Sequence, residues 1–220
     1  MEPNDTAALT KQLHASIVAG VLDDAACAAL ETLAATNASH ALRVISKLSS
    51  LTSEAPSAAA QLAVALKLLQ RLAEALPQAS FVEWQPVLFQ ALDATHVEVS
   101  HAVTALLPEL MKRDEQLMQR IFELYMSTAS SPSTCQREVL VSYGCKHAKS
   151  FFTKCTEYMT TPQQQQQQQL RALELLNDVV AAQGPLVYQI TETNCFQALI
   201  TILRVRCHIR DRSLEDMTDG

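Results

Sequence analysis

The chain has 220 residues, 48% of them hydrophobic, and a formal net charge of −6. This length allows one or two domains with a sizeable core. The negative charge disfavours a general nucleic-acid binder, because such domains usually present a basic face to phosphates. No apolar run reaches the roughly 18–20 residues that span a bilayer, and residues 1–12 carry acidic side chains where a secretory signal peptide would be basic. We therefore expect a cytoplasmic or nuclear protein with no membrane partner.

The composition predicts an all-α fold. Only four Gly are present, and Ala, Leu and Gln, which are good helix formers, are abundant. Runs of β-branched and aromatic residues at a period of two, which would indicate strands, are missing. The six cysteines lie far apart along the chain, a distribution typical of reduced thiols rather than of a disulfide framework.

The sequence predicts Ala-rich, loosely packed helices over residues 1–52. Apolar spacing and capping residues predict one helix over 5–19 with Asp5 as N-cap and Gly20 at its end, a second that starts after Asp23 or Asp24, and a third that starts at Asn37 or Ser39. A connector over 50–57 then leads into a long leucine-rich helix, which Ser57 caps and Pro77 ends.

The central stretch, 80–126, predicts two amphipathic helices joined by a break at 93–96. Apolar residues recur every three or four positions on both sides of the break, so the pair is expected to form an αα-hairpin. Pro108 is expected to kink the second helix or to end it early, and Asp114 to begin the next one. Such a hairpin cannot bury both faces alone, so other helices must stack on it.

The remaining segments also predict helices. Pro132 is expected in the first turn of a helix that follows a connector over 128–135, and Gly144 marks a kink or a point of close packing. Part of the glutamine run Gln163–Gln169 is expected to lengthen the next helix. The apolar face of that helix is expected to consist of Leu170, Leu173, Leu176 and Val180. A last helix is expected over 193–208, followed by a disordered acidic tail over 211–220.

These elements amount to about eleven antiparallel amphipathic helices, the pattern of an α-solenoid of the HEAT/armadillo-like type. We expect a single repeat domain over 1–210.

The central hairpin resembles one HEAT repeat. Such repeats commonly place a Pro in the first helix, an Asp at the turn and apolar residues in the second helix, and the matching positions are Pro86, Asp93, Val97, Val99, Ala102 and Leu106. The sequence departs from the pattern near Ser100, where the family usually has a Lys or Arg that bonds to the turn Asp. Within that superfamily, residues 89–118 are similar to the early repeats of the symplekin family, which are scaffolds of mRNA 3′-end processing. That resemblance implies a scaffolding role and transfers no functional residue.

The sequence contains no motif for catalysis, for a cofactor or for a metal. Cys145, His147 and Cys155 lack the close Cys pairs of a zinc site, and no Gly-rich phosphate-binding loop is present. Two basic clusters occur, and each is either a solvated face or a patch for an acidic partner or an RNA backbone. They are Lys146, Lys149 and Lys154, and Arg204, Arg206, Arg210 and Arg212.

We therefore expect a non-enzymatic scaffold that binds other proteins of a multi-subunit complex and needs no cofactor. The alternatives are a regulatory subunit of an enzyme complex and an RNA-binding helical repeat protein. Polar positions outside the apolar stripes of the central repeats are the candidate partner-binding residues: Glu98, His101, Lys112, Arg113, Gln119 and Arg120.

Overall fold

The computed structural model describes residues 3–49, 56–75, 81, 84–127, 132–160 and 166–183. Within these ranges the chain forms nine α-helices and no strand, which confirms the expected all-α class. The helices are α1 (Pro3–Ala19), α2 (Asp24–Ser49), α3 (Pro56–Ala75), α4 (Gln85–Leu92), α5 (Val97–Arg113), α6 (Glu115–Ser127), α7 (Thr134–Lys146), α8 (Ala148–Thr160) and α9 (Gln166–Gln183). The predicted Pro77 stop, the helix over 193–208 and the tail over 211–220 lie outside the described residues.

The chain divides into two compact units. Unit 1 consists of Met1–Gln119 with Ser133–Val139, and unit 2 of Arg120–Pro132 with Leu140–Gly220. Helices α6 and α7 therefore contribute residues to both units. A single domain over 1–210 stays a prediction, because the part after residue 183 is not described.

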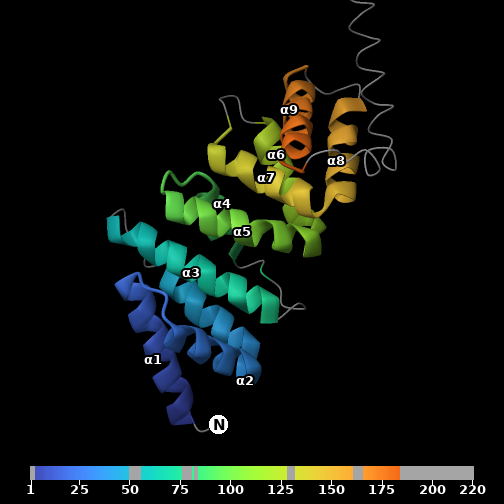
Figure 1. The fold of residues 1–220 in the computed structure, drawn as a ribbon. Helices are drawn as coiled ribbons and strands as arrows, with labels where there is room; N and C mark the ends of the chain where they lie inside the picture. The colour runs from blue at the N-terminus through green and yellow to red at the C-terminus, as the bar shows by residue number, and fades with distance from the viewer. Residues whose placement is uncertain are drawn as a thin grey trace, which may run out of the picture. The chain divides into compact units, whose positions relative to one another are not determined.

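Helix α3 is the central helix of unit 1, where it packs against α1, α2 and α5 (Figure 1). Its buried side chains are Ala63, Val64, Ala65, Leu66, Leu68, Leu69, Leu72 and Ala73. At 3.6 residues per turn these positions cover most of the circumference of the helix. Lys67, Arg71 and Glu74 are exposed along the one edge that remains open. The helix begins at Pro56, so the predicted cap at Ser57 is wrong: proline fits the first helical position and starts the helix two residues earlier than that cap implies.

The α4–α5 hairpin confirms the predicted break, because α4 ends at Leu92 and α5 begins at Val97. The predicted apolar residues of α5 are buried: Val99, Val103, Leu106 and Leu110. Pro108 does not end the helix, which continues to Arg113. Burial of Leu106, Leu107 and Leu110 around the proline offsets the backbone hydrogen bond that it removes.

The N-terminal helices differ from the prediction in number. Helix α2 runs without a break from Asp24 to Ser49, so the predicted new helix at Asn37 or Ser39 is wrong. Neither Gly nor Pro occurs within α2, and residues with good capping propensity do not end a helix unless the chain has another reason to turn. Gly20 ends α1 as predicted, with a φ of 69° that favours glycine. Asp23 caps α2 by accepting a hydrogen bond from the Ala26 amide at 2.6 Å.

Helix α7 begins at Thr134, after the proline that was expected in its first turn. Its cap is Ser133, whose Oγ accepts a hydrogen bond from the Gln136 amide at 3.1 Å. Pro132 therefore precedes the helix and does not lie in its first turn. The prediction for Asp114 is confirmed, because its carboxylate accepts hydrogen bonds from the Gln116 and Leu117 amides at the start of α6.

Unit 2 is built around aromatic side chains from α6 and α8. The ring centroid of Phe122 lies 5.8 Å from that of Phe151 and 6.3 Å from that of Tyr158. Burial, with a smaller contribution from the Glu123 and Glu157 carboxylates, raises the pKa of Tyr158 to about 12. Helix α9 packs against α8.

Helix α9 begins inside the glutamine run, at Gln166, which confirms that part of the run is helical. Of the predicted apolar face, Leu176 is buried, Leu173 and Val180 are half-buried and Leu170 is 40% exposed. The other buried residues of the helix are Arg171, Ala172, Leu175 and Val179, so the buried face is rotated from the predicted one. Two contacts set this rotation. Arg171 bonds to α6, and Val179 lies against Gly144 of α7, where an added Cβ would approach Val179 Cγ2 to 2.6 Å. Gly144 is thus a point of close packing.

Two arginines from later helices cap the C-termini of earlier ones. In unit 1, Arg113 Nη1 donates to the Ala73 carbonyl near the end of α3 at 2.5 Å. In unit 2, Arg171 Nη1 donates to the Tyr125 and Met126 carbonyls of α6 at 2.9 and 3.1 Å. Neither α3 nor α6 has a basic residue in its own last turn. Each arginine therefore supplies the positive charge that a helix C-terminus favours.

Gly144→Ala is expected to destabilise the protein by about 1–3 kcal/mol, because the new methyl group overlaps Val179 and Phe151. Denaturant melts would measure the loss, with Ser142→Ala on the same helix as the control. Gly144→Ala combined with Val179→Ala should cost less than the sum of the single changes, since the smaller side chain makes room. Strict additivity would contradict this explanation.

Arg171→Met is expected to cost about 2–5 kcal/mol, because it removes a buried charge-assisted donor from two helix-terminal carbonyls while keeping the apolar stem. Arg113→Met removes a similar bond from an exposed side chain and should cost less. Equal losses in chemical denaturation would show that burial of the guanidinium does not determine the strength of the cap.

Candidate protein-interaction surface

The six candidate partner-binding residues lie on two helices. Four of them are exposed on α5: Glu98, His101, Lys112 and Arg113. Gln119 is half-buried on the unit 1 part of α6, and Arg120 is exposed on the unit 2 part. The structure thus places five candidates in unit 1 and describes Arg120 with unit 2.

Glu98, His101 and Lys112 share one face of α5. Separations of three and eleven residues bring side chains back to nearly the same side of a helix. The face opposite carries the buried side chains of Val99, Val103 and Leu110. The helical period of the sequence was sufficient to find this exposed face.

Arg113 has a structural role that the sequence did not reveal. Its guanidinium caps α3 through the Ala73 carbonyl, 40 residues earlier in the chain. Because Arg113 ends α5 and Ala73 lies in the last turn of α3, the two helices run in the same direction, as Figure 1 also shows. Charge reversal at Arg113 would therefore weaken the fold as well as any partner contact.

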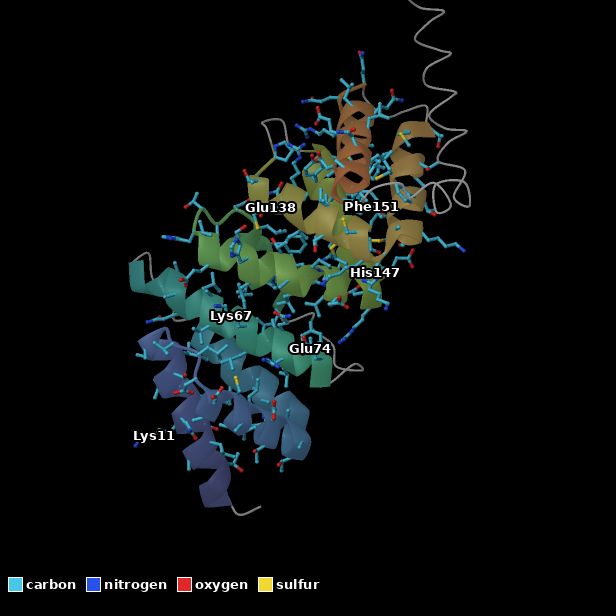
Figure 2. All side chains as sticks on the ribbon, viewed as in Figure 1. Lys11, Lys67, Glu74, Glu138, His147 and Phe151 are labelled. Atoms are coloured by element: carbon cyan, nitrogen blue, oxygen red, sulfur yellow. The ribbon has the colours of Figure 1, made fainter. Side chains whose placement is uncertain are left out.

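The open edge of α3 carries charged residues that sequence reasoning missed. Lys67, Arg71 and Glu74 are exposed on the helix that packs beside α5, and Figure 2 labels Lys67 and Glu74. Gln70 donates to the Glu74 carboxylate at 3.4 Å. The signal was present in the sequence, since charged residues at a spacing of three or four interrupt an otherwise apolar helix.

A polar joint connects the α4–α5 turn to the start of α7. Gln136 Nε2 donates to Asp93 Oδ1 at 2.8 Å, and Ser133 Oγ donates to the Leu92 carbonyl at 2.7 Å. In the HEAT pattern the turn aspartate bonds to a Lys or Arg, which this sequence lacks near Ser100. Here Asp93 bonds instead to the neutral amide of Gln136, 43 residues later. Sequence spacing gave no indication of this partner.

Cys135 lies buried next to this joint. Burial raises the pKa of its thiol, and the Glu138 and Asp93 carboxylates raise it further, against the opposing effect of the Ser100 and Thr104 hydroxyls. A thiol with a raised pKa stays protonated at neutral pH and is a poor nucleophile. This environment favours a packing role for Cys135.

No group of three or more His, Cys, Asp and Glu side chains among the described residues is placed to hold a metal ion. In the first basic cluster, Lys154 Nζ pairs with Glu157 Oε2 at 2.7 Å. The arginines at 204–212 lie outside the described part of the chain. None of the described helices combines the length and apolar content needed to cross a membrane.

Comparison with known families identifies the helical region. The family model described as "Hamartin, N-terminal domain" matches residues 86–212, more than half of the 220 residues. The match covers the described chain from α4 to α9, which includes the α4–α5 hairpin and the polar joint. Neither a curated protein nor a solved structure matches the chain, and the resemblance to HEAT and symplekin repeats finds no support in the family match. The chain therefore belongs to the hamartin N-terminal domain family.

Proposed function

We propose that this protein is a non-enzymatic α-solenoid scaffold that binds other proteins along the exposed edges of α3 and α5. The observation that carries the proposal is a set of hydrogen bonds between distant segments of the chain, whose sequence separation of 40 to 46 residues is about the length of one helical repeat.

The separation is similar in both units. In unit 1 it is 43 residues for Gln61 and the Val18 carbonyl, 40 for Arg113 and the Ala73 carbonyl, and 43 for Gln136 and Asp93. In unit 2, Arg171 bonds to carbonyls 46 and 45 residues earlier. HEAT and armadillo repeats are about 40–47 residues long. Each of these bonds connects one segment of the chain to the segment that lies one repeat length earlier, and this supports a stacked array of repeats.

The alternation of helices supports a common surface for α3 and α5. Helix α3 packs on α2 and α5 packs on α4, while α3 and α5 pack on each other. In a two-layer array this pattern puts α3 and α5 in the same layer, so that their open edges face the same side. We define the α3–α5 face by Lys67, Arg71, Glu98, His101 and Lys112, which are all exposed. A stacked array offers a partner an extended surface of this kind.

Lys67→Glu together with Lys112→Glu is expected to reduce capture of the main protein partner by about tenfold or more, because a few interface residues usually carry most of the binding energy. The measurement is affinity capture of the tagged full chain from cells, with partners quantified by mass spectrometry. Circular dichroism should not change because both side chains are exposed, and the melting temperature should fall only slightly, since Lys112 lies in the last turn of α5 where a positive charge is favoured. Arg113 is left intact because it caps α3.

The matched control is Lys11→Glu with Lys149→Glu, which makes the same change of charge at exposed positions of α1 and α8. Full partner recovery by the Lys67/Lys112 variant would rule out the α3–α5 face, and equal loss in the control would indicate a general effect of charge. Recovery of cleavage and polyadenylation factors would test the mRNA 3′-end-processing setting, which stays a prediction.

A further inference from the structure

Two exposed carboxylates lie where the α4–α5 turn meets the start of α7: Asp93 and Glu138. A hydrogen bond connects each of them to a neighbouring helix. Gln136 Nε2 of α7 donates to Asp93 Oδ1 at 2.8 Å, and Ser100 Oγ of α5 donates to Glu138 Oε2 at 3.2 Å. Figure 2 labels Glu138 on α7, near the start of α5. We call these two residues the acidic rim.

Helix dipoles do not account for the acidic rim. Asp93 is the C-cap residue of α4, where the dipole disfavours a carboxylate. Glu138 lies beyond the first turn of α7, where the dipole has little effect. The dipole of its own helix therefore stabilises neither charge.

Gln136, at the base of the rim, has a buried hydrogen-bond acceptor. The residue is only 4% exposed, and its Oε1 has no hydrogen-bond partner within the part of the chain that the structure describes. Its own Nε2 bonds to Asp93, so the amide oxygen lies close to that carboxylate. A buried acceptor next to a carboxylate favours a ligand that carries both a positive charge and N–H donors.

An apolar residue lies beside the carboxylates. Val97, the first residue of α5, is 67% exposed and lies three residues before Ser100, on the same side of the helix as this partner of Glu138. Two basic residues lie nearby in the chain: His96 precedes α5, and Arg137 lies about 100° around α7 from Glu138. The local surface thus combines negative charge with an exposed apolar side chain.

We propose that the acidic rim binds a basic segment of a partner protein. Arginine or lysine side chains of the partner pair with Asp93 and Glu138, and an apolar residue of the same segment packs on Val97. Guanidinium groups suit this surface because their several N–H donors can serve a carboxylate and an amide oxygen together. The proposal rests on the proposed scaffold function and adds the chemical class of one partner segment.

The test uses the full chain and a fluorescein-labelled peptide of four arginines spaced by alanine and valine. Asp93→Asn with Glu138→Gln removes two charges but keeps the acceptor oxygens for Gln136 and Ser100, so the fold is preserved. Glu31→Gln with Glu74→Gln is the matched control, since both residues are exposed elsewhere in unit 1. Fluorescence anisotropy at about 0.15 M salt should show a Kd about tenfold higher for the rim variant and nearly unchanged for the control.

Equal weakening in the rim variant and the control would overturn the proposal, because it would show general attraction to an acidic chain. No binding of the peptide to the unaltered protein would also overturn it. Val97→Ser should weaken binding further, by loss of the apolar contact.

Cellular capture separates this proposal from the proposed function. If the rim variant retains its partners while the Lys67/Lys112 variant loses them, the scaffold function stands and the rim is excluded as a partner site. If the rim variant alone loses partners, the rim is supported and the α3–α5 face is not the site.

Discussion

Burial of α3 from several sides is the constraint on which unit 1 depends. Helices α1, α2 and α5 all pack on it, and its small residues Ala63, Ala65 and Ala73 permit close approach. The contact with the end of α1 is tight, since a Cβ on Gly20 would lie 3.0 Å from the Ala60 Cβ. A change of volume in α3 therefore affects three neighbours at once.

The two arginines that cap helix C-termini add electrostatic stabilisation to this packing. A helix that is buried on most sides cannot send its last carbonyls to water, so another part of the chain must supply donors. Arg113 and Arg171 do so for α3 and α6, respectively. Both come from sequence-distant helices, so each cap also fixes which helix ends meet.

Local signals in the sequence predicted most of the helices, and tertiary contacts explain where the prediction failed. The α4–α5 break, the Asp114 cap and the helical part of the glutamine run depend on nearby residues, and the structure confirms them. The rotation of α9 depends on Arg171 and on the space at Gly144, which no helical period encodes. The exposed face of α5 followed from periodicity, whereas the Asp93–Gln136 bond and the structural role of Arg113 needed the fold.

The neutral amide opposite Asp93 has a consequence for ionic strength. A lysine or arginine in place of Gln136 would form an ion pair, which dissolved salt screens and which neutralises the aspartate. The Gln136 amide holds α7 to the turn through a dipole, so added salt has little effect on this joint. The aspartate is also exposed to solvent. One hydrogen bond therefore joins two helices and still leaves a carboxylate whose attraction for other molecules depends on the surrounding electrolyte.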